Sequence, residues 1–169
     1  MGYPVLVGWA VRLVRTMSEN SRAFGLTSEV ARGVSRMLMD AGWSPLLEFT
    51  LPNGRRLDVA AISGSGEIVA VEIKVSLEDF RGDGKWVEYL DYCDRYFFAV
   101  PDGFPILVLP EEHGLIVADK FGAAIIREAT GIREASGAPL SPARRKAMLI
   151  RFARTAAERY ARMIDPNRV

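Results

Sequence analysis

The sequence predicts an α/β protein in which helices flank a mixed sheet of about five strands. Three apolar-rich segments, at 45–51, 55–62 and 67–75, follow one another with Pro-Asn-Gly and Gly-Ser-Gly turns between them. Short alternating segments joined by such turns are typical of an antiparallel meander. A periodic helical segment precedes them, and helical and strand segments follow, so the order begins α-β-β-β-α-β.

A first helix is expected at 27–40, with Thr27 or Ser28 as its N-cap and Gly42 after its end. The polar stretch at 18–22 is expected to be a loop. Four apolar residues recur at helical spacing and predict the face that packs on the sheet: Val30, Val34, Met37 and Leu38.

The later part of the chain predicts smaller elements around one long helix. A turn-like segment is expected at 78–84, a helix at 85–93, and strands at 96–100, 106–109 and 115–118. Ser141 followed by Pro142 is the pattern of a capped helix start and predicts a C-terminal helix at 141–165. Its expected buried stripe is Met148, Phe152, Ala156, Tyr160 and Met163. The whole chain, 1–169, is expected to form a single domain with its core at 26–103.

The composition limits the classes of protein that fit. Apolar residues make up 49% and charged residues 25% of the 169 residues, which is typical of a soluble globular domain. Cys93 is the single cysteine, so no intrachain disulfide can form, and a cytoplasmic location is expected. The apolar stretch at 5–11 is interrupted by Arg12, which argues against a membrane span or a secretory signal. With one Cys and one His, a structural zinc site of nitrogen and sulfur ligands is not expected, so any metal is expected to bind oxygen ligands.

Charge is unevenly distributed along a chain whose net charge is only +1. Residues 141–169 hold eight Lys and Arg against two acidic residues. Such a basic helix on an acidic body can bind phosphates, or it can simply offset the charge of that body. Four basic residues are candidates for contacts with nucleic acid: Arg56, Arg144, Arg145 and Lys146.

The Gly-Ser-Gly hairpin brings three charged residues onto one face. A three-residue loop pairs Ser63 with Glu67, and the same register sets Asp58 opposite Glu72. Lys74 shares the face of Glu72, because side chains alternate along a strand. The opposite face is expected to be core: Leu57, Val59, Ala61, Val71, Ile73 and Val75.

Two carboxylates held close together repel each other unless a cation lies between them. Oxygen ligands suit Mg²⁺ or Mn²⁺, and a bound water can then attack a phosphorus atom. Lys74 would orient that water or stabilise the charged transition state. Asp58, Glu72 and Lys74 therefore predict hydrolysis of a phosphodiester.

These residues resemble those of a known group of nucleases. Arg55-Arg56-Leu57-Asp58, and Val71-Glu72-Ile73-Lys74 after the hairpin, resemble the restriction-endonuclease-like PD-(D/E)XK superfamily. The run from Val71 to Pro101, with Gly82-Asp83-Gly84-Lys85-Trp86, is more closely similar to the MmcB-like bacterial DNA repair proteins.

The resemblance implies a role for each matching residue. Asp58 and Glu72 would be direct metal ligands, with the Ile73 carbonyl as a third, and Lys74 would be the catalytic lysine. Glu29 matches the acidic residue that often binds the metal through water. Lys85 matches an additional basic residue of the site.

Several of these residues could instead have a purely structural role. Asp58, Glu72 and Lys74 could form a surface salt-bridge cluster, but residues 68–71 are all apolar and indicate a strand buried on both faces. Glu29 could serve the helix dipole, and Lys85 could be merely solvated. For Asp83, a helix N-cap is preferred over a ligand.

The function expected from the sequence is a Mg²⁺- or Mn²⁺-dependent endonuclease that cuts DNA in repair. The alternatives are a nuclease-fold DNA-binding scaffold that has lost turnover, and a nuclease that processes RNA. DNA is the expected partner, with repair proteins as further candidates, and no membrane contact is expected.

Overall fold

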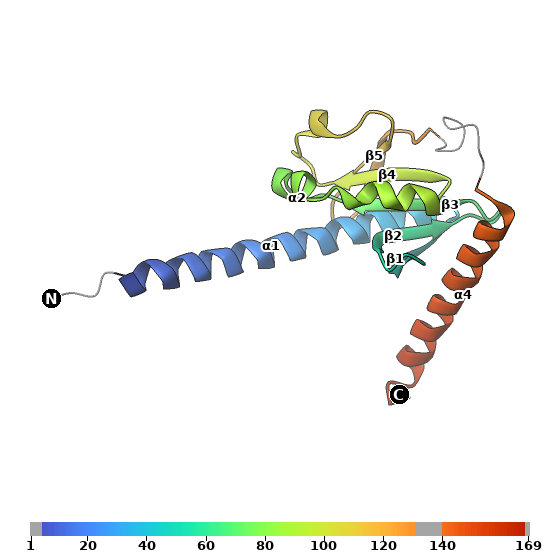
Figure 1. Cartoon of the computed structure of the whole chain (residues 1–169), viewed down its shortest axis with the longest axis horizontal. Helices are drawn as coiled ribbons and strands as arrows, with labels where there is room; N and C mark the ends of the chain where they lie inside the picture. The colour runs from blue at the N-terminus through green and yellow to red at the C-terminus, as the bar shows by residue number, and fades with distance from the viewer. Residues whose placement is uncertain (1–4, 131–139, 168–169) are drawn as a thin grey trace.

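The computed structural model describes residues 5–130 and 140–167, with 5–20 and 22 described as backbone only. A six-stranded sheet in the order β1-β2-β3-β4-β5-β6 lies at the centre of the molecule (Figure 1). Within these residues, none of the helices is both long and apolar enough to cross a membrane. The elements in chain order are α1 (Val5–Asp40), β1 (Ser44–Thr50), β2 (Arg56–Ile62), β3 (Ile68–Ile73), α2 (Leu77–Gly82), η1 (Lys85–Tyr92), β4 (Arg95–Val100), η2 (Ile106–Val108), β5 (Gly114–Ala118), β6 (Ala123–Arg127) and α4 (Pro142–Ile164).

The sheet is mixed, as the sequence predicts. Strands β1, β2 and β3 form the expected antiparallel meander, β3, β4 and β5 are parallel, and β6 runs antiparallel to β5. The sheet has six strands rather than about five: β6 was not expected, whereas the strand expected at 106–109 is absent from the sheet. The predicted mixed α/β fold with flanking helices is confirmed.

Both faces of the sheet are covered (Figure 1). The C-terminal half of α1 packs on one face through Val30, Val34 and Leu38. On the other face, η1 and α4 enclose a second core that includes Tyr96 and Phe98. Every residue of β3 is buried, which agrees with a strand covered on both sides. Any charged side chain on β3 is therefore held away from bulk water.

The first helix is much longer than predicted. It runs unbroken from Val5 to Asp40, so the expected loop at 18–22 and the expected caps are wrong. The hydroxyls of Thr27 and Ser28 instead donate to carbonyls one turn earlier in the helix, at 2.9 and 3.0 Å. Polar residues are tolerated here because the N-terminal half of α1 projects beyond the sheet (Figure 1).

The end of α1 agrees with the prediction. Gly42 has a φ of +80°, and its N–H donates to the Met39 carbonyl at 2.9 Å. The Trp43 N–H donates to the Leu38 carbonyl, also at 2.9 Å. This pair of bonds is a Schellman motif, which needs a residue with positive φ and so favours glycine.

Three other segments differ from the prediction. The stretch expected to be a turn contains helix α2, which Ser76 caps by accepting from the Asp79 N–H at 3.1 Å. The segment at 85–93 is a 3₁₀ helix, η1, and the strand expected at 106–109 is replaced by the short 3₁₀ helix η2 after Pro105.

Helix α4 begins as predicted, with Ser141 accepting from the Arg144 N–H at 3.3 Å and proline in the first turn. Its buried stripe is shorter than expected, because Tyr160 is 62% and Met163 73% exposed. These residues lie where the end of α4 extends past the sheet (Figure 1).

A kink interrupts β1 and β2 at the same level. Pairs Leu47–Val59 and Phe49–Leu57 flank Glu48 and Asp58, between which no pair is formed. Glu48 has a φ of +51°, a strained value for a residue with a side chain. Beyond the kink, Leu57 enters the core on the α4 side, whereas Val59 faces α1, so the expectation that both share one face is wrong.

Close packing between α1 and the β5–β6 turn gives a test of the fold. A Cβ on Gly33 would lie 2.0 Å from the Asp119 carbonyl oxygen and 2.4 Å from that of Gly122. Replacing Gly33 with Ala is expected to lower the free energy of unfolding by about 1–3 kcal/mol or more, since both clashing atoms are backbone.

Gly25 in the same helix provides the matched control, because a Cβ added to it would meet no atom within 4 Å. The Gly25→Ala substitution is expected to raise stability by about 0.5–1 kcal/mol through helix propensity. Urea unfolding followed by circular dichroism measures both variants. Equal effects of the two substitutions would contradict the close contact.

Candidate active site

The β2–β3 hairpin aligns two carboxylates as the sequence predicts. The pairs Ala60–Ala70 and Val59–Val71 have the expected register, and the Ser63 N–H donates to the Glu67 carbonyl at 3.0 Å. Continuing this register sets Asp58 opposite Glu72. The paired ladder stops one step earlier, and Asp58 Oδ2 accepts from the Ile73 N–H at 2.8 Å. The Asp58 side chain thus takes the place of a backbone partner for the Ile73 N–H.

Lys74, just after the end of β3, is only 2% exposed. Its Nζ donates to Glu72 Oε1 at 3.0 Å and to Asp83 Oδ2 at 2.6 Å, and Asp79 Oδ1 lies 4.0 Å away. Burying an ammonium group is costly unless it is paired with anions and hydrogen-bonded. Burial acts to lower the pKa of Lys74, but the acidic neighbours raise this pKa above its ordinary value, so the side chain is cationic.

Glu72 and Asp58 share this buried environment. Burial, followed by the charge of Asp58, raises the pKa of Glu72 to about 8, against the opposing effect of Lys74. Burial raises the pKa of Asp58 to about 6, and the Ile73 N–H and Lys74 oppose it. Glu72 Oε2 is buried without a hydrogen-bond partner in the described part of the chain. The pair is therefore short of positive charge and of one donor or cation.

Asp58, Glu72 and Lys74 line an open cavity of about 500 Å³, where Asp58 lies near the start of β2 and Glu72 near the end of β3. Of the residues predicted for the site, Asp58, Glu72, Ile73, Lys74 and Lys85 line it. Glu29 is not among the lining residues, although Thr27 of the same helix is. The remaining lining residues are Glu78, Asp79, Gly82, Asp83 and Tyr89.

The donor set fits a hard cation with few protein ligands. Across residues 5–130 and 140–167, no group of three or more His, Cys, Asp or Glu side chains is arranged to hold a metal ion. Asp58 and Glu72 supply two carboxylates, and the unpartnered Glu72 oxygen is of the kind that a cation would satisfy. Mg²⁺ commonly binds one or two carboxylates and keeps several waters, so the residues present are compatible with it.

Asp83 is a part of the site that the sequence did not predict. A helix N-cap was expected, and the Asp83 side chain does bind the N–H of the first residue of η1, although Gly84 holds the N-cap position and Asp83 also ends α2. Its Oδ1 accepts from the Lys85 N–H at 2.9 Å while its Oδ2 binds Lys74. The glycines on either side of Asp83 indicate a tight turn, but nothing local in the sequence indicates that this turn reaches the end of β3.

The basic residues expected to contact nucleic acid lie in several places. Arg56 pairs with Glu48 at 2.5 Å, beside the kink. Arg144 donates to the Asp91 carbonyl at 3.0 Å and lies over the Tyr92 ring, and Lys146 is exposed.

Arg145 has a structural role that is independent of any ligand. It forms two hydrogen bonds of 2.7 Å with the Asp94 carboxylate and one of 2.8 Å with the Gly66 carbonyl. Asp94 also accepts from the Ile68 N–H at 2.8 Å, so the contact ties α4 to the start of β3.

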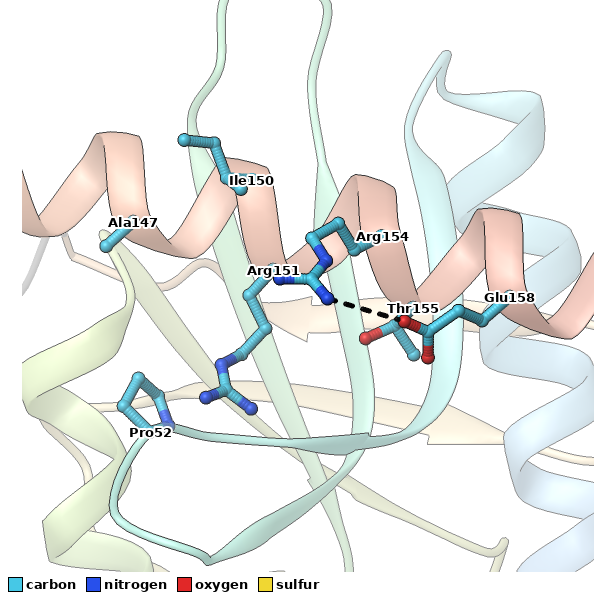
Figure 2. A pocket seen from close by; sticks show the side chains of 7 residues that line it. All are labelled: Pro52, Ala147, Ile150, Arg151, Arg154, Thr155 and Glu158. Carbon is cyan, nitrogen blue, oxygen red and sulfur yellow. Dashed lines mark ion pairs between the residues drawn. The ribbon is translucent and has the colours of Figure 1, made fainter.

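A separate cavity of about 550 Å³ lies between α4 and the β1–β2 turn (Figure 2). Arg154 and Glu158, one turn apart on α4, form an exposed ion pair of 3.9 Å beside this cavity, and such a pair contributes little stability (Figure 2). Arg151 donates to the Thr50 carbonyl at 3.4 Å, and Arg159 donates to the carbonyls of two β1 residues. Much of the positive charge of α4 is therefore used to bind the chain's own backbone.

The fold and the site define a mixed α/β protein with an acidic, lysine-containing pocket at the ends of two neighbouring strands. The chain belongs to the MmcB-like family, described as "DNA repair protein MmcB-like", which matches residues 16–167. The resemblance found in the sequence is thus confirmed, and the family indicates a role in DNA repair.

A solved structure is also similar to this chain. It is the SPO1766 protein of unknown function from Silicibacter pomeroyi, with 42% sequence identity and a TM-score of 0.78. The match covers 84% of this chain and 93% of that protein. No curated protein matches this chain.

The raised pKa values predict how stability depends on pH. Unfolded carboxyls titrate near about 4, so up to about pH 8 the folded state binds more protons than the unfolded state. The free energy of unfolding contributed by Glu72 and Asp58 therefore falls as pH rises through this range. Glu72→Gln, which removes the larger shift, is expected to flatten the melting-temperature profile between about pH 6.5 and 8.5.

Thermal unfolding in EDTA measures this slope, with Glu128→Gln as the control because Glu128 is an exposed glutamate on the chain. The control is expected to keep the wild-type slope. Parallel profiles for wild type and Glu72→Gln would show that Glu72 does not carry the predicted shift.

The contacts of Arg145 give a second stability prediction. Arg145→Ala removes three charge-assisted bonds and is expected to cost about 1.5–3 kcal/mol, whereas Lys146→Ala at the exposed neighbouring position is expected to be close to neutral. Denaturant unfolding of both variants checks this. An Arg145→Ala variant as stable as Lys146→Ala would contradict the structural role.

Proposed function

We propose that this chain is a metal-dependent nuclease with a PD-(D/E)XK core that hydrolyses DNA phosphodiester bonds during repair. The observation that carries the proposal is the buried, unpartnered Oε2 of Glu72, next to Asp58 and in an open cavity with Lys74. An unsatisfied buried acceptor costs free energy, so a cation bound at this oxygen would stabilise the site. The raised pKa values of both carboxyls support a site that is completed by a cation.

In this proposal Asp58 and Glu72 hold Mg²⁺ or Mn²⁺, with the Ile73 carbonyl as a further ligand. The bound metal supplies a Lewis acid for the phosphate and lowers the pKa of the attacking water. Lys74 donates hydrogen bonds to the phosphate or to that water and stabilises the negative charge that develops. Lys85 contacts a neighbouring phosphate from the cavity wall, and Glu29, which does not line the cavity, acts through water.

Asp83 has a positioning role in the same scheme. Its 2.6 Å bond to Lys74 keeps the ammonium charged and fixes its direction, while the bond from the Lys85 N–H fixes Asp83 itself. DNA is favoured as the substrate by the description of the family and by the sequence resemblance. Chemistry at the phosphate does not itself distinguish bases.

A second candidate is a DNA-binding repair module without turnover. This candidate is favoured by the two hydrogen bonds of Lys74 to Glu72 and Asp83, because they occupy the ammonium group that catalysis would use. The small number of possible metal ligands also favours a module without turnover. Among the residues described, no three His, Cys, Asp or Glu side chains are arranged to hold a metal ion. The two candidates differ in whether bound DNA is cut.

Metal binding and cleavage test the proposal together. Calorimetric titration with Mn²⁺ is expected to detect binding to wild type that is lost in Asp58→Asn and Glu72→Gln. Lys74→Ala is expected to bind the metal yet cleave labelled DNA about 100- to 1,000-fold more slowly. Glu128→Gln should match wild type in both assays.

Cleavage that continues undiminished in both Glu72→Gln and Lys74→Ala would overturn the proposed site. Wild type that binds DNA but leaves it uncut in Mn²⁺, across single-stranded and duplex substrates, would favour the module without turnover.

A further inference from the structure

A third cavity, of about 670 Å³, adjoins the acidic site. It lies between α1 and the β1–β2 pair, and it shares Thr27, Asp58 and Ile73 with the acidic cavity. The two cavities therefore adjoin at these residues and form a path that passes Asp58. The part of this path that lies between α1 and β1 is called the α1 groove below.

Cations line the α1 groove from both sides. Arg32 and Arg36 come from successive turns of α1, and Arg56 comes from β2. Arg36 is fixed by bonds of 2.8 and 3.3 Å to carbonyls of the β5–β6 turn, and Arg56 is fixed by its pair with Glu48. Arg32 is exposed at the groove surface. Positive charge is thus placed along the approach to an acidic centre, where it can guide a polyanion.

Exposed apolar side chains line the same groove. Phe24 is 77% exposed, Met39 54% and Leu47 39%, and all three line the groove. A large exposed aromatic ring is costly in water and offers a flat face for stacking. A groove that combines arginines with an exposed aromatic ring suits an unpaired nucleic-acid strand, because the guanidinium groups can bind its phosphates and the ring can stack on a base.

We infer that the α1 groove binds an unpaired nucleic-acid strand and leads it to the acidic pocket. The inference rests on the proposed function and adds the class of substrate. A duplex hides the faces of its bases in the stack, so it cannot place a base on Phe24 without unpairing. A single strand, a flap or a frayed end offers a free base together with its phosphates. An acidic peptide would use the arginines but would gain nothing from the aromatic ring.

Fluorescence anisotropy of the full chain in EDTA tests the groove without cleavage. The probes are a labelled oligo(dT) of about 20 nucleotides and a blunt duplex of equal length, measured from low to moderate salt. Wild type is expected to bind the single strand more tightly. Phe24→Ala is expected to weaken single-strand binding about tenfold, with little effect on the duplex.

Arg32→Ala is expected to reduce the slope of log affinity against log salt by about 0.7, the value for one phosphate contact on a single strand. The matched controls are Phe121→Ala and Arg162→Ala, since both residues are exposed and neither lines the groove. Both controls are expected to bind oligo(dT) as wild type does. Melting temperatures of all four variants are expected to equal that of wild type, because each side chain is exposed.

Equal binding of strand and duplex by wild type would overturn the inference. So would Phe24→Ala and Arg32→Ala variants that bind oligo(dT) as wild type does, or control variants that lose as much affinity as these two. Binding of polyglutamate in preference to both oligonucleotides would assign the groove to an acidic peptide instead.

Cleavage in Mn²⁺ separates this inference from the proposed function. If oligo(dT) binding depends on Phe24 but no DNA is cleaved, the inference about the α1 groove stands and the proposed nuclease function is overturned. If the protein cleaves duplex DNA without preferring single strands, and Phe24→Ala leaves that cleavage unchanged, the nuclease proposal stands and the inference about the α1 groove is overturned.

Discussion

Burial of the Lys74 ammonium is the constraint on which the arrangement of the site depends. A cation that is 2% exposed requires anions within hydrogen-bond distance, and Glu72 and Asp83 provide them at 3.0 and 2.6 Å. Glu72 is supplied by the same strand, but Asp83 must come from the connection between α2 and η1. The bond between Asp83 and Lys74 therefore fixes the position of that connection, which forms part of the cavity wall. One carboxylate oxygen of Glu72 binds Lys74, and the other has no partner among the described residues. Glu72 can therefore stabilise the fold with one oxygen and bind a ligand with the other.

The kink at Glu48 and Asp58 is the second requirement of the site. Asp58 binds the Ile73 N–H at the point where the regular pairing of β2 with β1 is interrupted and its pairing with β3 ends. A residue with a side chain at φ +51° carries strain of about 1–3 kcal/mol, which the surroundings must hold in place. Arg159 of α4 donates to the carbonyls of Leu47 and Glu48, and Arg56 pairs with the Glu48 side chain. The basic helix therefore supports the geometry of Asp58 from outside the pocket.

Local patterns predicted the centre of this structure, and distant contacts decided the rest. The Gly-Ser-Gly loop sets the register that aligns Asp58 with Glu72, and the apolar run of β3 indicates burial, because both depend on nearby residues. The continuity of α1 through 18–22 was not readable, since a polar stretch is equally compatible with a loop and with a helix that projects into solvent. The contact of Asp83 with Lys74, the displacement of Leu57 to the other core and the exposure of Tyr160 each depend on elements that are separated along the chain.

The kink also changes what the open side of β1 can do. An edge strand presents free backbone groups that can pair with a strand from another molecule and begin aggregation. In β1, the left-handed residue at Glu48 breaks the straight run of such groups, and arginines of α4 already bind the carbonyls of Leu47, Glu48 and Thr50. The features that shape the pocket thereby cap one border of the sheet against strand addition by a neighbouring copy.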